Sequence, residues 1–81
     1  MEDNITRNSI WFKLVGRDLT RYLIYERDRI RIWVPIVPET SKQELELTIE
    51  IYEEELGFVP VATRTIKPYA IRDRDIAITL V

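Results

Sequence analysis

The stretch SKQELELTIEIYEEELG, residues 41–57, decides the fold class because it fits two kinds of element. Ser41 and Glu44 have the spacing of a helical capping box, and Gly57 stands where a helix would end. These signals would give an α+β protein with one helix over residues 41–56 packed on a sheet.

The alternation of side chains within this stretch favours a strand instead. From residue 45 to residue 51, every second residue is Leu or Ile, and the residues between them are Glu or Thr. This period places all four aliphatic side chains on one face of a strand, whereas a helix would leave Leu47 and Ile51 facing solvent. A helix would also place three glutamates, residues 53–55, at the negative end of its dipole. We therefore predict a strand.

The next run, FVPVATRTI at residues 58–66, has the composition of a strand that returns beside the first. The predicted register pairs Tyr52 with Phe58, Ile51 with Val59, Ile49 with Val61, and Glu46 with Arg64. Pro60 has no N–H to donate, so we expect this strand to lie at a sheet edge or to carry a bulge.

Residues 22–34, YLIYERDRIRIWV, are typical of a second hairpin, because two strand-like runs flank a short charged turn. Folding Tyr25 onto Ile30 across a turn at Arg27 and Asp28 gives two chemically distinct faces. The predicted core face consists of Leu23, Tyr25, Ile30, Ile32 and Val34. The predicted outward face consists of Tyr22, Ile24, Glu26, Arg29, Arg31 and Trp33.

Two further runs extend the β pattern toward both ends of the chain. SIWFKLV at residues 9–15 and DIAITLV at residues 75–81 are rich in β-branched and aromatic residues. Six short strands separated by Pro and charge clusters predict an all-β protein, either a small six-stranded sandwich or a partly open barrel. Residues 1–8 are predicted to form a flexible polar arm, and residues 9–81 a single β-rich domain.

The composition excludes most catalytic chemistry. The chain of 81 residues contains neither Cys nor His, so it offers no disulfide, no thiolate and no imidazole. Because no pair of nucleophile and base can then be assembled, we predict a protein that is not an enzyme and that holds no cofactor and no metal.

The hydropathy pattern predicts no membrane partner. The longest apolar stretch, residues 33–37, is far shorter than the roughly 20 residues that a transmembrane helix needs. The chain also opens without a basic segment followed by an apolar one, so we expect no secretory signal and a cytoplasmic location.

Residue usage is typical of hyperthermophile proteins. The chain has twelve isoleucines, and its nine arginines outnumber its three lysines. Charged residues make up 32% of the chain, and thermolabile residue types are scarce. In composition alone the chain resembles small proteins of hyperthermophilic archaea and their viruses, and we expect an origin of that kind; no motif identifies a family.

Four residues of the outward hairpin face are the candidate binding residues: Tyr22, Arg29, Arg31 and Trp33. Aromatic rings stack on nucleic-acid bases and guanidinium groups contact phosphates, so one hypothesis is nucleic-acid binding. Trp, Tyr and Arg also anchor protein interfaces, and the net charge of −2 is unlike that of basic nucleic-acid-binding domains. We therefore predict a non-catalytic domain that mediates protein–protein contact or self-assembly, with nucleic-acid binding as the alternative.

The charge distribution and the strand edges predict a homodimer. Residues 39–56 carry a net charge of −6, whereas residues 1–38 and 57–81 each carry +2, which supplies complementary patches. The runs at 9–15 and 75–81 contain no proline, so we expect them to pair with each other or with a second copy. The dimer is predicted to bury Trp11 or Trp33 at or beside its interface.

Overall fold

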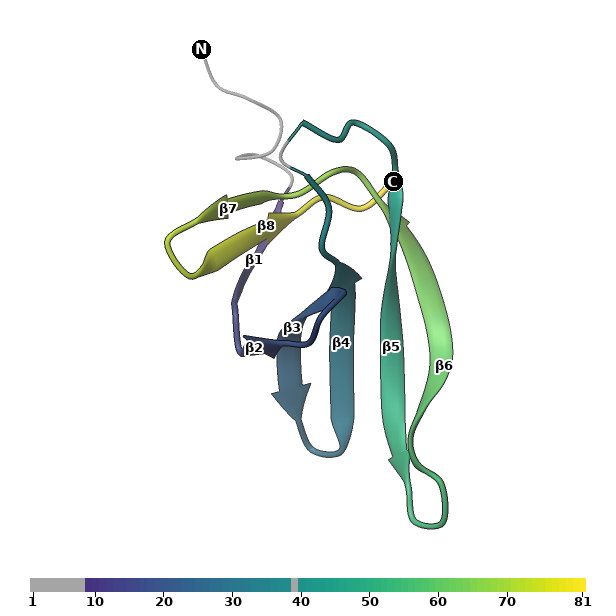
Figure 1. Cartoon of the computed structure of the whole chain (residues 1–81). Coiled ribbons are helices and arrows are strands. Elements are labelled where there is room, and N and C mark those ends of the chain that lie inside the picture. Colours follow the sequence, from purple (N-terminus) through teal and green to yellow (C-terminus); the bar gives the residue numbers. More distant parts are fainter. Residues whose placement is uncertain (1–8, 39) are drawn as a thin grey trace.

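The computed structural model describes residues 9–38 and 40–81, which form eight strands in two antiparallel sheets (Figure 1). The strands are β1 (Ile10–Lys13), β2 (Gly16–Arg17), β3 (Arg21–Arg27), β4 (Ile30–Pro35), β5 (Leu45–Glu53), β6 (Gly57–Ile66), β7 (Ala70–Arg72) and β8 (Asp75–Ile78). The arm predicted at residues 1–8 lies outside the described residues.

The larger sheet has the strand order β2-β3-β4-β5-β6, and the smaller has the order β1-β8-β7. The sheets pack roughly as a small sandwich and do not close into a barrel (Figure 1). The described part of the chain contains no helix, so the all-β prediction is confirmed and the helix alternative at 41–56 is wrong. The structure adds two strands to the predicted six, and β2 and β7 are only two and three residues long.

The β5–β6 hairpin has the predicted register near its turn and a different register beyond a bulge. Tyr52 pairs with Phe58, as predicted, and β6 is an edge strand. The register then shifts next to Pro60, which confirms the expected bulge and leaves Val61 as the extra residue. The later pairs are therefore Ile49 with Ala62 and Glu46 with Thr65, in place of the predicted Val61 and Arg64.

The β3–β4 hairpin turns one residue later than predicted. Asp28 and Arg29 both have positive φ, at 53° and 69°, and form a two-residue turn between Arg27 and Ile30. This pair of left-handed residues gives a turn whose twist matches that of the strands, although such turns favour Asn-Gly and Asp-Gly. The predicted pairing of Tyr25 with Ile30 is wrong, because Tyr25 pairs with Ile32.

A bulge in β3 redistributes the side chains of this hairpin between the two faces. The register shifts between Leu23 and Tyr25, and the extra residue Ile24 is buried among the core residues. The predicted faces are therefore wrong for three residues: Ile24 and Tyr22 lie on the core side, and Leu23 lies opposite Trp33 on the other side.

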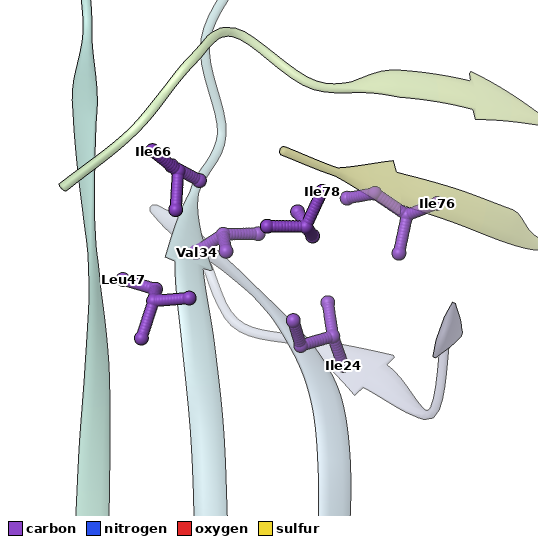
Figure 2. Packing of buried hydrophobic residues seen from close by; sticks show 6 residues of the cluster. All are labelled: Ile24, Val34, Leu47, Ile66, Ile76 and Ile78. Atoms are coloured by element: carbon purple, nitrogen blue, oxygen red, sulfur yellow. The ribbon is translucent and has the colours of Figure 1, made fainter. Parts of the chain in front are cut away.

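The core lies between the two sheets and is built from aliphatic side chains (Figure 2). Its buried members come from both sheets: Ile24, Val34, Leu47, Ile66, Ile76 and Ile78. Burying one such side chain stabilises the fold by about 1.5–3 kcal/mol, so this cluster is the main force that joins the sheets.

The runs near the two ends of the described chain pair with each other inside one molecule. Ile10 pairs with Ile78 and Trp11 with Ala77 in the three-stranded sheet. One residue pair, Ile66 and Leu80, then bridges β6 to the segment after β8. Of the two expected solutions for these edges, the intramolecular one is found.

The described residues contain no helix of the length and apolarity that crossing a membrane requires.

Candidate functional site

Trp33 lies at the centre of the outer face, the side of the five-stranded sheet that points away from the core. Its cross-strand partners are Leu23 on β3 and Thr48 on β5. The Arg21 guanidinium carbon lies 4.0 Å from the centre of the Trp33 ring, and Trp33 Nε1 donates a 2.7 Å hydrogen bond to Glu50 Oε1. Arg21 also lies 3.6 Å from the second Glu50 oxygen. Trp33 is therefore only 9% exposed, because its own chain covers it.

Two more arginines stack on aromatic rings on the same face. The Arg31 guanidinium lies 4.0 Å from the centre of the Phe58 ring, and Arg31 Nε donates a 2.6 Å hydrogen bond to Glu26. Arg29, in the turn before β4, lies 4.8 Å from the centre of the Tyr52 ring. The Tyr52 and Phe58 rings meet edge to face at 5.3 Å. Each of these guanidinium groups lies over an aromatic ring in cation–π contact.

Carboxylates neutralise the arginines of the outer face. The ion pairs are Arg21 with Asp18 and Glu50, Arg29 with Glu54, and Arg31 with Glu26. Three arginines thus face four carboxylates, so this face has no excess of positive charge to attract phosphate groups.

Asp18 fixes the turn between β2 and β3 and positions Arg21. One carboxylate oxygen accepts hydrogen bonds from the backbone N–H groups of Thr20 and Arg21, at 2.9 and 2.7 Å. The other oxygen lies 3.1 Å from the Arg21 guanidinium. The hydrogen bond from Thr20, aided by those from Arg21, holds the pKa of Asp18 below its usual value. Asp18 therefore stays ionised at neutral pH and orients Arg21.

Tyr22 lies on the opposite side of the sheet, so the structure groups only Arg29, Arg31 and Trp33 of the four predicted residues. Tyr22 pairs with Val34 and packs against the core. Its ring meets the Tyr69 ring edge to face at 6.2 Å, beside an open groove of about 560 Å³. Tyr22 thus belongs to the packing between the sheets.

Tyr69 joins the segment before β7 to the end of β4. Its hydroxyl donates a 2.7 Å hydrogen bond to the Pro35 carbonyl and accepts one of 3.4 Å from the Val37 N–H. Burial raises the pKa of Tyr69 above its usual value. The two tyrosines are therefore structural residues.

The acidic tip, residues 53–55 at the β5–β6 turn, caps its own turn. Glu53 Oε1 accepts hydrogen bonds from the backbone N–H groups of Glu55 and Leu56, at 2.9 and 3.0 Å. Within residues 9–38 and 40–81, no group of three or more carboxylates is arranged to hold a metal ion.

A second surface, which the sequence analysis did not identify, lies on the inner face of the five-stranded sheet. β5 and β6 are nine and ten residues long, whereas β1, β7 and β8 have three or four residues and lie toward one end of the larger sheet (Figure 1). Within residues 9–38 and 40–81, no second layer covers the remaining length of the inner face. We call this remaining length the uncovered end, and its apolar residues are Tyr25, Ile30, Ile51, Val59 and Ala62, with Ile32 and Ile49 at its margin, where they pack against the core.

The strand register arranges the uncovered end in two rows across four strands. One row runs through Tyr25, Ile32, Ile49 and Ala62, and the next through Arg27, Ile30, Ile51 and Val59. Ile51 is 43% exposed, although it continues the alternation that buries Leu47 to 6% exposure. No signal in the sequence indicated this surface, since the predicted runs at 9–15 and 75–81 were as long as the alternation at 45–51, whereas β1 and β8 have only four residues each.

Comparison with models of protein families, with curated proteins and with solved structures finds no match to this chain.

Proposed function

We propose that this protein is a non-catalytic domain that mediates protein–protein contact by associating with itself as a homodimer. The uncovered end is the observation that carries the proposal. A sheet in a sandwich normally has its apolar face covered by the facing sheet, and here five apolar residues extend beyond that cover, with Ile32 and Ile49 at its margin. Contiguous exposed apolar surface on a small protein marks an interaction site.

The chemistry of the side chains supports a non-catalytic role. The chain has neither Cys nor His to serve as a nucleophile or base. Asp18, whose pKa is lowered by backbone hydrogen bonds, stays ionised at neutral pH and is therefore a poor proton donor. The outer-face carboxylates pair with arginines and serve structural roles.

Nucleic-acid binding has less support. Bases would have to stack on the rings of Trp33, Tyr52 and Phe58, and a guanidinium group already lies over each of them. Titrating a 20-nucleotide single strand at low salt, with tryptophan emission as the readout, tests this alternative. We expect no saturable change, and salt-dependent saturation would restore nucleic-acid binding as the better proposal.

The residue usage supports an origin in a hyperthermophilic archaeon or its virus, because Arg-rich ion pairs such as those on the outer face accompany that usage. A melting temperature above about 90 °C would agree with this origin, whereas one near 50–60 °C would argue for a mesophile.

The test of self-association is the mass in solution, measured by light scattering from about 1 to 500 μM, a range set by the affinity expected of small interfaces. We expect the mass to rise with concentration from that of the 9.7 kDa chain toward twice that value. A monomeric mass over the whole range would overturn the proposal. Trp33 emission is a poor reporter of the dimer, because Trp33 is already covered within one chain.

A further inference from the structure

We infer that the partner of the uncovered end is the same surface of a second copy, packed face to face about a two-fold axis with the two chains antiparallel. This inference rests on the proposed self-association and names its surface and geometry. It follows from the side chains of the uncovered end, from the space that the three-stranded sheet occupies, and from the position of the acidic tip.

The side chains of the uncovered end suit a copy of themselves. Seven of the eight positions in its two rows are apolar, and the one charge, Arg27, lies at the outer end of one row. In a chain with 32% charged residues, a charge-free centre of this width is unusual. Two aliphatic sheet faces related by a two-fold axis interdigitate as the two inner faces of a sandwich do.

The three-stranded sheet permits only the antiparallel arrangement. Packed sheets lie about 10 Å apart, so the second copy must enter the layer that this small sheet already occupies over the other half of the inner face. A parallel copy would place its own covered half in that occupied space. In the antiparallel arrangement, the five-stranded sheet of the second copy lies in the same layer as the small sheet of the first. It begins where that small sheet ends and extends past the β5–β6 turn of the first copy.

Electrostatic repulsion favours the same arrangement. Glu53, Glu54 and Glu55 all lie at the β5–β6 turn and are all exposed. A parallel dimer would bring six such carboxylates together, whereas an antiparallel dimer places the two acidic tips at opposite ends.

Pairing through the free edge of β6 is less favourable. β6 is the longest edge strand, but Pro60 removes a donor from it and the bulge at Val61 breaks its regular register. Both features are devices that prevent strands from pairing edge to edge. The open surface available to a second copy is therefore the inner face.

The contact is small, so the dimer is expected to be weak. With about 4.8 Å between strands and about 6.8 Å between same-face residues along a strand, two rows across four strands cover on the order of 260 Å² of sheet. Standard interfaces bury about 800 Å² of accessible surface per partner. We expect a dissociation constant on the order of tens of micromolar or weaker.

Ile51→Glu tests the surface. A carboxylate at the centre of an aliphatic contact must be desolvated without a partner, so we expect the dissociation constant to rise at least tenfold. Ile71→Glu is the matched control, because Ile71 is 41% exposed in a strand of the other sheet. Ala62→Glu is a second variant on the exposed rim of the uncovered end, and circular dichroism checks that each variant keeps its β signal.

The concentration series separates the two claims. A wild-type dimer that Ile51→Glu and Ala62→Glu weaken and Ile71→Glu does not weaken supports the inference. A wild-type dimer that withstands both uncovered-end variants overturns the inference and leaves the proposed self-association standing. A wild-type protein that never dimerises overturns the proposed function itself.

Single cysteines test the orientation, because the natural chain contains none. In the antiparallel dimer Ile51→Cys lies near the two-fold axis, and a short bis-maleimide is expected to join two copies. Glu54→Cys places the thiols at opposite ends of the dimer, so no covalent dimer above the level of Ile71→Cys is expected. Efficient linkage of Glu54→Cys, or none of Ile51→Cys at concentrations where the dimer forms, would overturn the antiparallel geometry.

Discussion

The two halves of the inner face of the five-stranded sheet share one residue pattern and differ in what covers them. Along β5, Leu47 is 6% exposed and Ile51 is 43% exposed, although both belong to the same uninterrupted alternation. Leu47 packs with Ile66 and Val34 in the core between the two sheets (Figure 2). Ile51 is not part of this core cluster. Alternation thus determines which face of a strand is apolar, and the length of the opposing layer determines how much of that face is buried.

The largest effect that separates the halves is expected from alanine substitutions. Ile66→Ala removes a side chain that is fully buried and should lower the free energy of unfolding by about 2–5 kcal/mol. Ile51→Ala should lower it by less than about 1 kcal/mol at low micromolar concentration, where the chain is monomeric, because water already contacts this side chain. Urea unfolding measures both values. Equal losses would mean that the uncovered end is packed as tightly as the core.

The sequence was sufficient to predict the fold class and the β5–β6 pairing near the turn. Strict alternation over residues 45–51 outweighed the capping box of Ser41 and Glu44, because a helix would have exposed half of the aliphatic residues. Pro60 correctly indicated both an edge strand and a bulge. These features depend on local patterns, which the sequence displays directly.

The register of the β3–β4 hairpin depended on backbone conformations that the sequence does not display. Asp28 and Arg29 adopt positive φ although neither is a glycine, and Ile24 occupies a bulge although no proline in that strand indicates one. Arg31 and Trp33 still share the outer face, because they alternate along one strand. Tyr22 was assigned to the wrong face, because its position relative to Trp33 depended on both the turn and the bulge.

A smaller effect is expected at Tyr69, which holds the covered half together through polar contacts. Tyr69→Phe removes the hydrogen bond to the Pro35 carbonyl and should lower the free energy of unfolding by about 0.5–1.5 kcal/mol. The uncovered end offers a control in Tyr25→Phe, for which the structure shows no hydrogen bond of the hydroxyl group to a described residue. A loss at Tyr25 as large as that at Tyr69 would contradict this assignment.

The pH dependence of stability gives a second readout for Tyr69. Burial raises its pKa in the folded state above the usual 10.0, so the folded protein holds this proton at a pH where the unfolded chain has begun to release it. This contribution to stability is fully present below pH 10 and is lost as the pH rises through the folded-state pKa. Stability should therefore fall more steeply above pH 10 in the wild type than in Tyr69→Phe, and parallel curves would show that the shift is absent.

The smallest effect is expected at Asp18, in an exposed turn that belongs to neither half of the inner face. Hydrogen bonds from the backbone N–H groups of Thr20 and Arg21 hold the pKa of Asp18 in the folded state below its ordinary value of 3.8. The contribution of Asp18 to stability is therefore present above pH 3.8 and is lost as the pH falls through the folded-state pKa. Asp18→Asn keeps an acceptor for the backbone but removes the charge that faces Arg21. Thermal unfolding between pH 2 and 7 should therefore show a slightly shallower acid limb for the variant, and Asp73→Asn, in another exposed turn, is the control for the removal of one surface carboxylate. If Asp18→Asn and Asp73→Asn behave alike, the turn hydrogen bonds do not hold the Asp18 carboxylate, and Arg21 must be oriented over Trp33 by Glu50 alone.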